Sequence, residues 1–96
     1  MKEYFIYILA SNKRGTLYIG VTNNLFKRVL DHKKRNIEGF TKKYQVNKLV
    51  YFEVFKYVNE ALYREKQLKK WKRQWKMNLI EAINPNWDDL SVEMYQ

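Results

Sequence analysis

The chain has 96 residues, and its 19 Lys and Arg side chains against 10 Asp and Glu give a formal net charge of +9 at pH 7. That length predicts one domain with one modest core, so residues 1–96 are taken as a single unit. The absence of Cys excludes a disulfide framework and a thiolate metal site, and the one His excludes a zinc site built from several histidines of the chain.

This excess of positive charge predicts a polyanionic partner, and nucleic acid is the commonest one. An acidic membrane surface and a solvated basic protein without a partner are the alternatives. No apolar run approaches the length needed to cross a bilayer. Residues 4–10 are interrupted by tyrosines and follow Glu3, so they make a poor signal peptide. We expect a cytoplasmic protein without membrane attachment.

Two aromatic-rich segments, residues 4–10 and 16–21, predict a pair of strands joined by a polar turn. A register symmetric about Asn12 and Lys13 places Tyr7 close to directly opposite Tyr18. Residues that face each other across an antiparallel pair project from the same face. Two phenols are therefore expected side by side, with Gly20 leaving open space nearby.

Short polar residues at 22–24 can cap a helix over residues 25–36. Arg28, His32 and Arg35 lie at i, i+4 and i+7 and so share one face of that helix. The apolar stripe on another face consists of Leu25, Phe26, Val29 and Leu30.

The rest of the chain predicts a basic loop at 40–48, a strand at 49–55 and helices at 60–72 and 75–83, the second of them separate or a kinked continuation of the first. Asn59 can cap the first of these helices. Asn84 ends the second because the residue before Pro85 is pushed out of the helical region. Trp87 and Leu90 are expected to anchor a short tail.

The helix at 60–72 carries a carboxylate on its apolar stripe, since Glu65 lies four residues after Ala61 and three before Leu68. A plain surface pair with Lys69 is the alternative reading of Glu65. Together the elements predict an α/β (α+β) fold, a three-stranded antiparallel sheet flanked by helices. We expect the site on one face of the sheet, between the helices at 25–36 and 60–72.

The hairpin contains a paired motif, Phe5-Ile6-Tyr7, ten further residues and then Tyr18-Ile19-Gly20. This pairing resembles the motif that gives the GIY-YIG endonucleases their name. Arg28, His32 one turn later and Glu65 on a later helix stand where that family keeps its working residues.

The resemblance covers nearly the whole chain and is strongest to the small bacterial members. Their Arg-Glu-Lys-x-Leu-Lys-Lys and Asn-Pro-x-Trp-x-Asp-Leu stretches are matched here at 64–70 and 84–90. The resemblance therefore implies that residues 1–96 form one GIY-YIG-like nuclease domain.

The chain departs from the family pattern in three places. Phe5 replaces the first Gly of the name, which should affect strand packing more than chemistry. Val21 and Thr22 stand where some members place a Lys. Asn78 and Asn84 are both candidates for a C-terminal Asn that orders the site in several members.

Phosphodiester hydrolysis needs an activated water, charge stabilisation on the phosphoryl oxygens and help for the leaving group. Glu65 can give one oxygen ligand to Mg²⁺ or Mn²⁺, whose shell is completed by waters and substrate phosphate. Arg28 offers a planar fork that matches phosphate. Tyr7 is the candidate general base, and we expect a close Arg28 and the metal to lower its pKa. Tyr18 would position the water or hold Tyr7, and His32 would accept a proton or contact phosphate, changing charge near pH 6.5.

Basic side chains of the loop and the later helices are assigned to the nucleic-acid backbone, with a solvated basic face as the alternative. The assigned residues are Lys42, Lys43, Lys69, Lys70 and Arg73. Trp71 and Trp75 are expected in the core rather than as base-stacking platforms.

These residues predict a metal-dependent endonuclease that acts on DNA rather than RNA, in the repair or processing of structured DNA. It needs Mg²⁺ or Mn²⁺ and no small-molecule cofactor. A catalytically inactive nucleic-acid-binding module is the alternative, because the charge favours it equally well. A third reading is a structural protein whose basic face binds an acidic partner protein.

Overall fold

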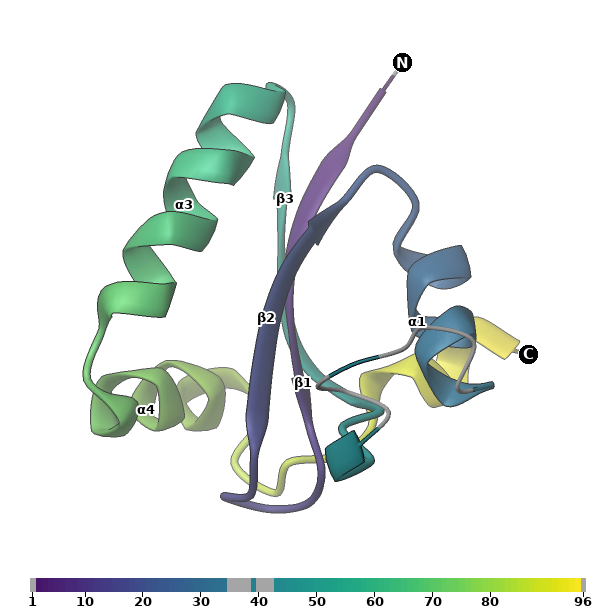
Figure 1. Cartoon of the computed structure of the whole chain (residues 1–96), viewed down its shortest axis with the longest axis vertical. Helices are drawn as coiled ribbons and strands as arrows, with labels where there is room; N and C mark the ends of the chain where they lie inside the picture. The colour runs from purple at the N-terminus through teal and green to yellow at the C-terminus, as the bar shows by residue number, and fades with distance from the viewer. Residues whose placement is uncertain (1, 35–38, 40–42, 96) are drawn as a thin grey trace.

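A computed structural model describes residues 2–34, 39 and 43–95 of the chain. Its elements are β1 (Tyr4–Ala10), β2 (Leu17–Thr22), α1 (Leu25–Lys33), β3 (Lys48–Phe55), α3 (Val58–Lys70), α4 (Arg73–Ile83) and a C-terminal 3₁₀ segment η1 (Leu90–Tyr95). The three strands form one antiparallel sheet in the order β2-β1-β3 (Figure 1). The predicted fold class is confirmed.

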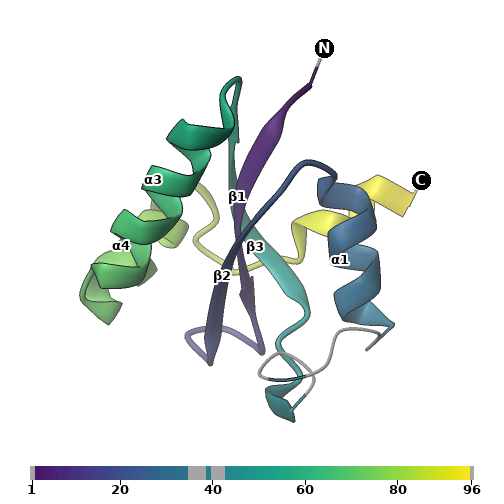
Figure 2. The same ribbon diagram turned by 45° about the horizontal axis from the view of Figure 1, so that its top comes forward.

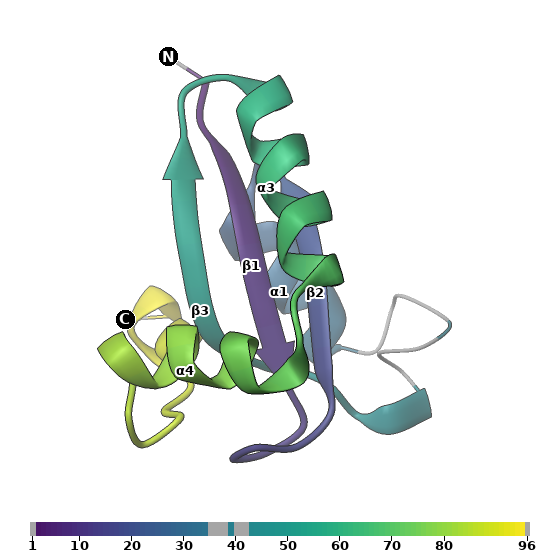
Figure 3. The ribbon, with the colours of Figure 1, turned by 90° about the vertical axis from the view of Figure 1, so that its left-hand side faces the viewer.

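The central strand β1 is buried on both faces because helices cover both sides of the sheet. Ile6, Ile8 and Ala10 pack with residues of α3 and α4, whereas Tyr7 and Leu9 pack with residues of α1. In Figure 3, α3 and α4 lie in front of the sheet and α1 lies behind it. The expectation of a site on one face between the first two helices is therefore wrong, since α1 and α3 lie on opposite faces.

Local sequence explains the start of α1 but not the start of α3. Asn24 caps α1, and its Oδ1 accepts a hydrogen bond from the Lys27 backbone N–H at 3.1 Å, as expected for a short polar residue there. The predicted cap of α3 is wrong, because Asn59 lies inside the helix and Tyr57 takes the cap position. Trp71 and the following residue are extended, so α3 and α4 are separate helices.

The C-terminal segment begins with the predicted stop. Asn84 is buried at the end of α4, and its amide donates to the carbonyls of Val50 and Asp88. From there the segment (yellow) runs around the end of the sheet to the side of α1 (Figure 2). There Asp89 accepts hydrogen bonds from Lys33 of α1 and from the backbone of β3. The hydrogen bonds of Asn84 thus anchor the start of the segment, and those of Asp89 fix it to α1 and β3.

None of the helices in the described part of the chain is long and apolar enough to cross a membrane.

Candidate active site

The register of the hairpin is centred on Lys13 and Arg14 rather than on Asn12 and Lys13. Tyr7 pairs with Gly20, and Tyr18 pairs with Leu9. The turn is four residues long, closed by a hydrogen bond from Gly15 N to Asn12 O, and its third residue has a positive φ of 56°. The prediction that Tyr7 and Tyr18 stand directly opposite is therefore wrong. A shift of two residues keeps both on one face, and their ring centroids lie 6.2 Å apart.

The space beside Gly20 is filled by the ring of Tyr7. A Cβ atom on Gly20 would lie 2.5 Å from the Tyr7 hydroxyl oxygen and 2.6 Å from its Cζ atom. Real Cβ atoms do not approach other atoms so closely, so only Gly allows the ring to lie in this position. The expectation of open space is corrected, and the role of Gly20 is to let Tyr7 lie across β2.

The Tyr7 hydroxyl lies between two side chains of α1. Arg28 Nε donates to it at 3.2 Å, and His32 Nε2 lies 3.3 Å from it. Their i, i+4 spacing on α1 brings both to the same side of the ring. A guanidinium can only donate, so the Tyr7 oxygen accepts from Arg28. In the contact with His32, the tautomer of the imidazole decides which group donates.

Burial determines the protonation states of Tyr7 and His32. Burial raises the pKa of Tyr7 to about 12, outweighing the hydrogen bond from Arg28, which lowers it. Burial and the charge of Arg28 lower the pKa of His32 to about 4. The resting state is therefore a neutral phenol and a neutral imidazole. In the free protein, Arg28 does not bring the pKa of Tyr7 toward neutrality, and His32 does not titrate near pH 6.5.

A hollow of about 250 Å³ runs over the outer edge of β2. Its lining residues are Leu17, Tyr18, Ile19, Lys69 and Lys76. Leu17 and Ile19 pack on the α3 side of the sheet and Tyr18 on the α1 side, so the hollow lies at the edge where the two faces meet. Tyr18 also lies 5.5 Å, centroid to centroid, from the ring of His32. Tyr18 thus lines the hollow and also lies against the rings of Tyr7 and His32.

Glu65 lies on α3, one turn before Lys69. Its side chain is 18% exposed, and its Oε2 lies 3.5 Å from Lys69 Nζ. The negative charge of Glu65 also raises the pKa of Tyr7, although its effect is smaller than those of burial, Arg28 and Tyr18. The carboxylate is therefore electrostatically coupled to the phenol, although α3 covers the other face of the sheet.

The GIY-YIG catalytic domain model matches residues 3–78 of the chain. The chain belongs to the GIY-YIG family. It is 38% identical over 80 residues to a UPF0213 protein of Staphylococcus saprophyticus, covering 83% of this chain and 96% of that one. It is also 41% identical over 78 residues to a UPF0213 protein of Clostridium perfringens, covering 81% and 83%.

A solved structure shares the fold. The solution NMR structure of a UPF0213 protein from Bacillus halodurans superposes with a TM-score of 0.56 at 24% identity, covering 91% of this chain and 92% of that one. Membership of the GIY-YIG family indicates a nuclease, which is a hydrolase with a nucleic-acid substrate. Nucleases of this family are generally metal-dependent.

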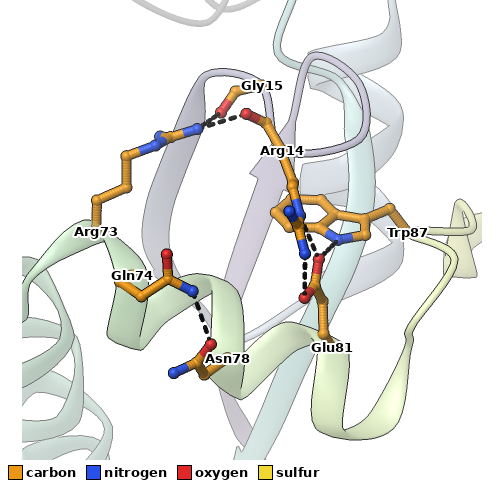
Figure 4. A network of polar contacts seen from close by, with 7 residues as sticks. All are labelled: Arg14, Gly15, Arg73, Gln74, Asn78, Glu81 and Trp87. Carbon is orange, nitrogen blue, oxygen red and sulfur yellow. Dashed lines mark hydrogen bonds and ion pairs between the residues drawn. The ribbon is translucent and has the colours of Figure 1, made fainter.

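The residues of this GIY-YIG chain that were predicted to bind the nucleic-acid backbone lie in different surroundings. Lys69 lines the hollow beside Tyr18, and Lys43 and Lys70 are exposed. Arg73 instead donates to the carbonyls of Arg14 and Gly15, both at 2.6 Å (Figure 4). Lys42 lies outside the described residues, as does Arg35.

Sequence reasoning missed Lys76 as a lining residue of the hollow. Its Nζ donates to the carbonyl of Lys69 at 3.4 Å. The two lysines are seven residues apart and on different helices, so helical periodicity gives no signal that they meet.

The donor set limits what metal this GIY-YIG site could hold. Among the described residues, no three or more His, Cys, Asp or Glu side chains group together. A metal ion here would therefore have Glu65 as its single carboxylate ligand, with waters and substrate phosphate as the other ligands. Mg²⁺ accepts such a shell, because it keeps several waters and needs only one or two carboxylates.

We expect His32 to titrate with a pKa of about 4 in the folded chain and near 6.5 when unfolded. Because the folded state holds the imidazole neutral, stability is fully present above pH 6.5 and is lost as the pH falls toward 4. About 2 kcal/mol should disappear between pH 7 and pH 5. The chain has one His, so its imidazole NMR signal gives the pKa directly, and urea unfolding gives the stability.

His32→Gln is the control, since it should remove most of this dependence. Arg28, which lowers the pKa of His32, and Asp31, which raises it, are the charged groups that act on the imidazole. A folded-state pKa of 6 or above would contradict the buried, neutral imidazole.

Proposed function

We propose that this GIY-YIG chain is a metal-dependent endonuclease that hydrolyses phosphodiester bonds of DNA, with residues 1–96 acting as one nuclease domain. We extend the proposal to structured DNA, as met in repair or processing. The observation that supports it most is the buried Tyr7 hydroxyl, held 3.2 Å from Arg28 Nε and 3.3 Å from His32 Nε2. A tyrosine that served only for packing would not need two such partners.

Tyr7 acts in this proposal as a proton relay. As the attacking water bonds to phosphorus, its proton becomes acidic and passes to the Tyr7 oxygen, while the Tyr7 proton passes to His32 Nε2. The pKa gap of about eight between Tyr7 and His32 corresponds to about 11 kcal/mol. That gap is too large for a phenolate to form beforehand, so the two transfers accompany the attack.

Arg28 provides the positive charge for the phosphoryl oxygens. Its Nε–H is used by Tyr7, and the other guanidinium N–H groups can donate to phosphate. The hydrogen bond to Tyr7, with a further contribution from Tyr18, raises the pKa of Arg28, so it stays charged at every working pH. One side chain thus positions Tyr7 and stabilises the charge that develops in the transition state.

Glu65 would hold Mg²⁺ or Mn²⁺. Its present partner, Lys69, is half exposed, and such an i, i+4 pair stabilises a helix by only about 0.3–0.5 kcal/mol. The carboxylate can therefore exchange this partner at little cost. When bound, the cation would polarise the scissile phosphate and assist departure of the 3′ oxygen.

A nucleic-acid-binding module without activity is the second candidate, favoured by the net charge of +9. It predicts binding with a steep salt dependence and no turnover with any metal. The third reading, a basic face that binds an acidic protein, predicts a copurifying partner that survives nuclease treatment of the extract.

The experiment that tests the proposal incubates purified chain with plasmid, branched DNA and RNA, with Mg²⁺, Mn²⁺ or EDTA. We expect cleavage of DNA that requires the added metal. Glu65→Gln, purified in parallel, should bring cleavage to background, because a neutral amide is a poor ligand for Mg²⁺. Equal cleavage by this variant would point to a contaminant, and binding without cleavage would favour the inactive module.

A further inference from the structure

We propose that the corner between α3 and α4 is a subsite for an unpaired nucleobase of the bound nucleic acid, which stacks on Trp75. The proposal rests on the proposed function, because it concerns the same substrate. It adds a binding site on α4, next to the hollow beside Tyr18.

Trp75 is not a core residue, contrary to the sequence prediction. Its side chain is 51% exposed, while Trp71 is partly buried and packs against the core on the α3 side. The two rings meet edge to face, with centroids 6.0 Å apart and planes at 84°. Trp71 thus holds Trp75 in a fixed orientation and leaves much of its ring accessible.

A hollow of about 340 Å³ lies against these rings. Its lining residues are Trp71, Trp75, Asn78 and Leu79. The last three lie at i, i+3 and i+4 on α4 and so share one face of that helix. This volume is within the range of small-ligand sites, and mostly apolar walls with one amide suit a flat base that has a polar edge.

Two cations lie beside the rings that line the hollow, and one of them, Arg64, is also ion-paired with Glu53 at 2.9 Å. Arg64 Cζ lies 5.2 Å from the centroid of the Trp71 ring, and Lys72 Nζ lies 5.7 Å from that of Trp75. Such an arrangement of aromatic rings and positive charge suits the bases and phosphates of a single strand. A second copy of this chain is the less suitable occupant, because its own cations would repel those around the hollow.

The subsite is continuous with the candidate active site. Trp75 and Lys76 are neighbours on α4, and Lys76 lines the hollow that Tyr18 and Lys69 also line. We expect a strand whose phosphate lies at the two lysines to place an adjacent base on the Trp75 ring. Stacking there requires a base that is not paired in a duplex.

Both ends of α4 are fixed to the hairpin, so the helix that carries Trp75 is rigid. Arg73 donates to two carbonyls of the turn, and Arg14 pairs with Glu81, whose carboxylate also accepts from the Trp87 indole N–H (Figure 4). These contacts use one side of α4, and Trp75 lies on another. A rigid aromatic ring loses little entropy when a base stacks on it.

The test measures binding in EDTA, where metal-dependent cleavage does not occur. Fluorescence anisotropy compares a labelled duplex that carries a single-stranded tail with a blunt duplex of the same length. Trp75→Ala should weaken binding of the tailed duplex about tenfold, which is about 1.4 kcal/mol, and change the blunt duplex less than about twofold. The slope of log K against log salt should not change, because no charge is removed.

Tyr57→Ala is the matched control. Tyr57 is 56% exposed and has Lys56 Nζ 5.8 Å from its ring centroid, but it lies at the opposite end of α3 from Trp71. This variant should bind both duplexes like the natural chain. Trp75→Phe should keep most of the affinity, and 2-aminopurine in the tail should be quenched by the natural chain and not by Trp75→Ala.

Equal losses on both duplexes, or no loss on the tailed one, would overturn the subsite while leaving the nuclease proposal in place. A Trp75→Ala variant that changes the mass of the particle in sedimentation would identify a second copy as the occupant and overturn the nucleobase. If the natural chain binds neither duplex, the proposed function fails and the subsite fails with it.

Discussion

Replacing Arg28 by alanine is expected to lower DNA cleavage at least about a thousandfold while the fold is kept. The change removes the cation for the phosphoryl oxygens and the donor that holds the Tyr7 hydroxyl. The side chain is partly exposed, so its loss should cost little stability. Single-turnover cleavage at saturating metal gives the rate, and thermal unfolding gives the stability.

Arg28→Lys is the matched variant, because it keeps the charge and loses the planar fork. We expect it to remain about a hundredfold below the natural chain. The His32 imidazole gives an independent measure, since Arg28 helps to lower its pKa. In Arg28→Ala that pKa should rise above about 4. Cleavage at the natural rate together with an unchanged His32 pKa would exclude Arg28 from the site.

The fold could be predicted because its signals are local. Aromatic and β-branched runs bounded by polar turns predict strands, and the structure places β1 at the predicted residues and β3 one residue longer. The register could not be predicted, because it depends on Arg14 adopting a positive φ in a four-residue turn. Nothing in the chemistry of an arginine indicates that conformation.

The group of Tyr7, Arg28 and His32 could be predicted in part. The spacing on α1 and the shared face of the hairpin are sequence properties, and the structure brings the three side chains together. Their pKa values could not be predicted, because burial is a property of the whole fold. A break between α3 and α4 was one of two predicted alternatives, but the segment contains neither Pro nor Gly, so the sequence did not decide between a break and a kinked continuation.

Replacing Gly20 by alanine should displace the Tyr7 ring and lower both stability and cleavage. The new methyl group would start 2.5 Å from the Tyr7 hydroxyl oxygen, so the ring must move. Tyr7 is fully buried and cannot turn outward, and overpacking of this kind costs about 1–3 kcal/mol. A displacement near 1 Å would separate the hydroxyl from Arg28 and His32 and lower cleavage about a hundredfold. Urea unfolding and single-turnover cleavage measure the two effects.

A stability loss alone could also lower activity, so a variant of similar stability is needed. Val21→Ala supplies it, because Val21 is the next residue of β2, packs on the opposite face and loses only apolar contacts. It should be destabilised to a similar extent and still cleave at close to the natural rate. If Gly20→Ala cleaves as well as Val21→Ala, the position of the Tyr7 ring over Gly20 does not matter for catalysis. The relay from water through Tyr7 to His32 would then lose its geometric basis.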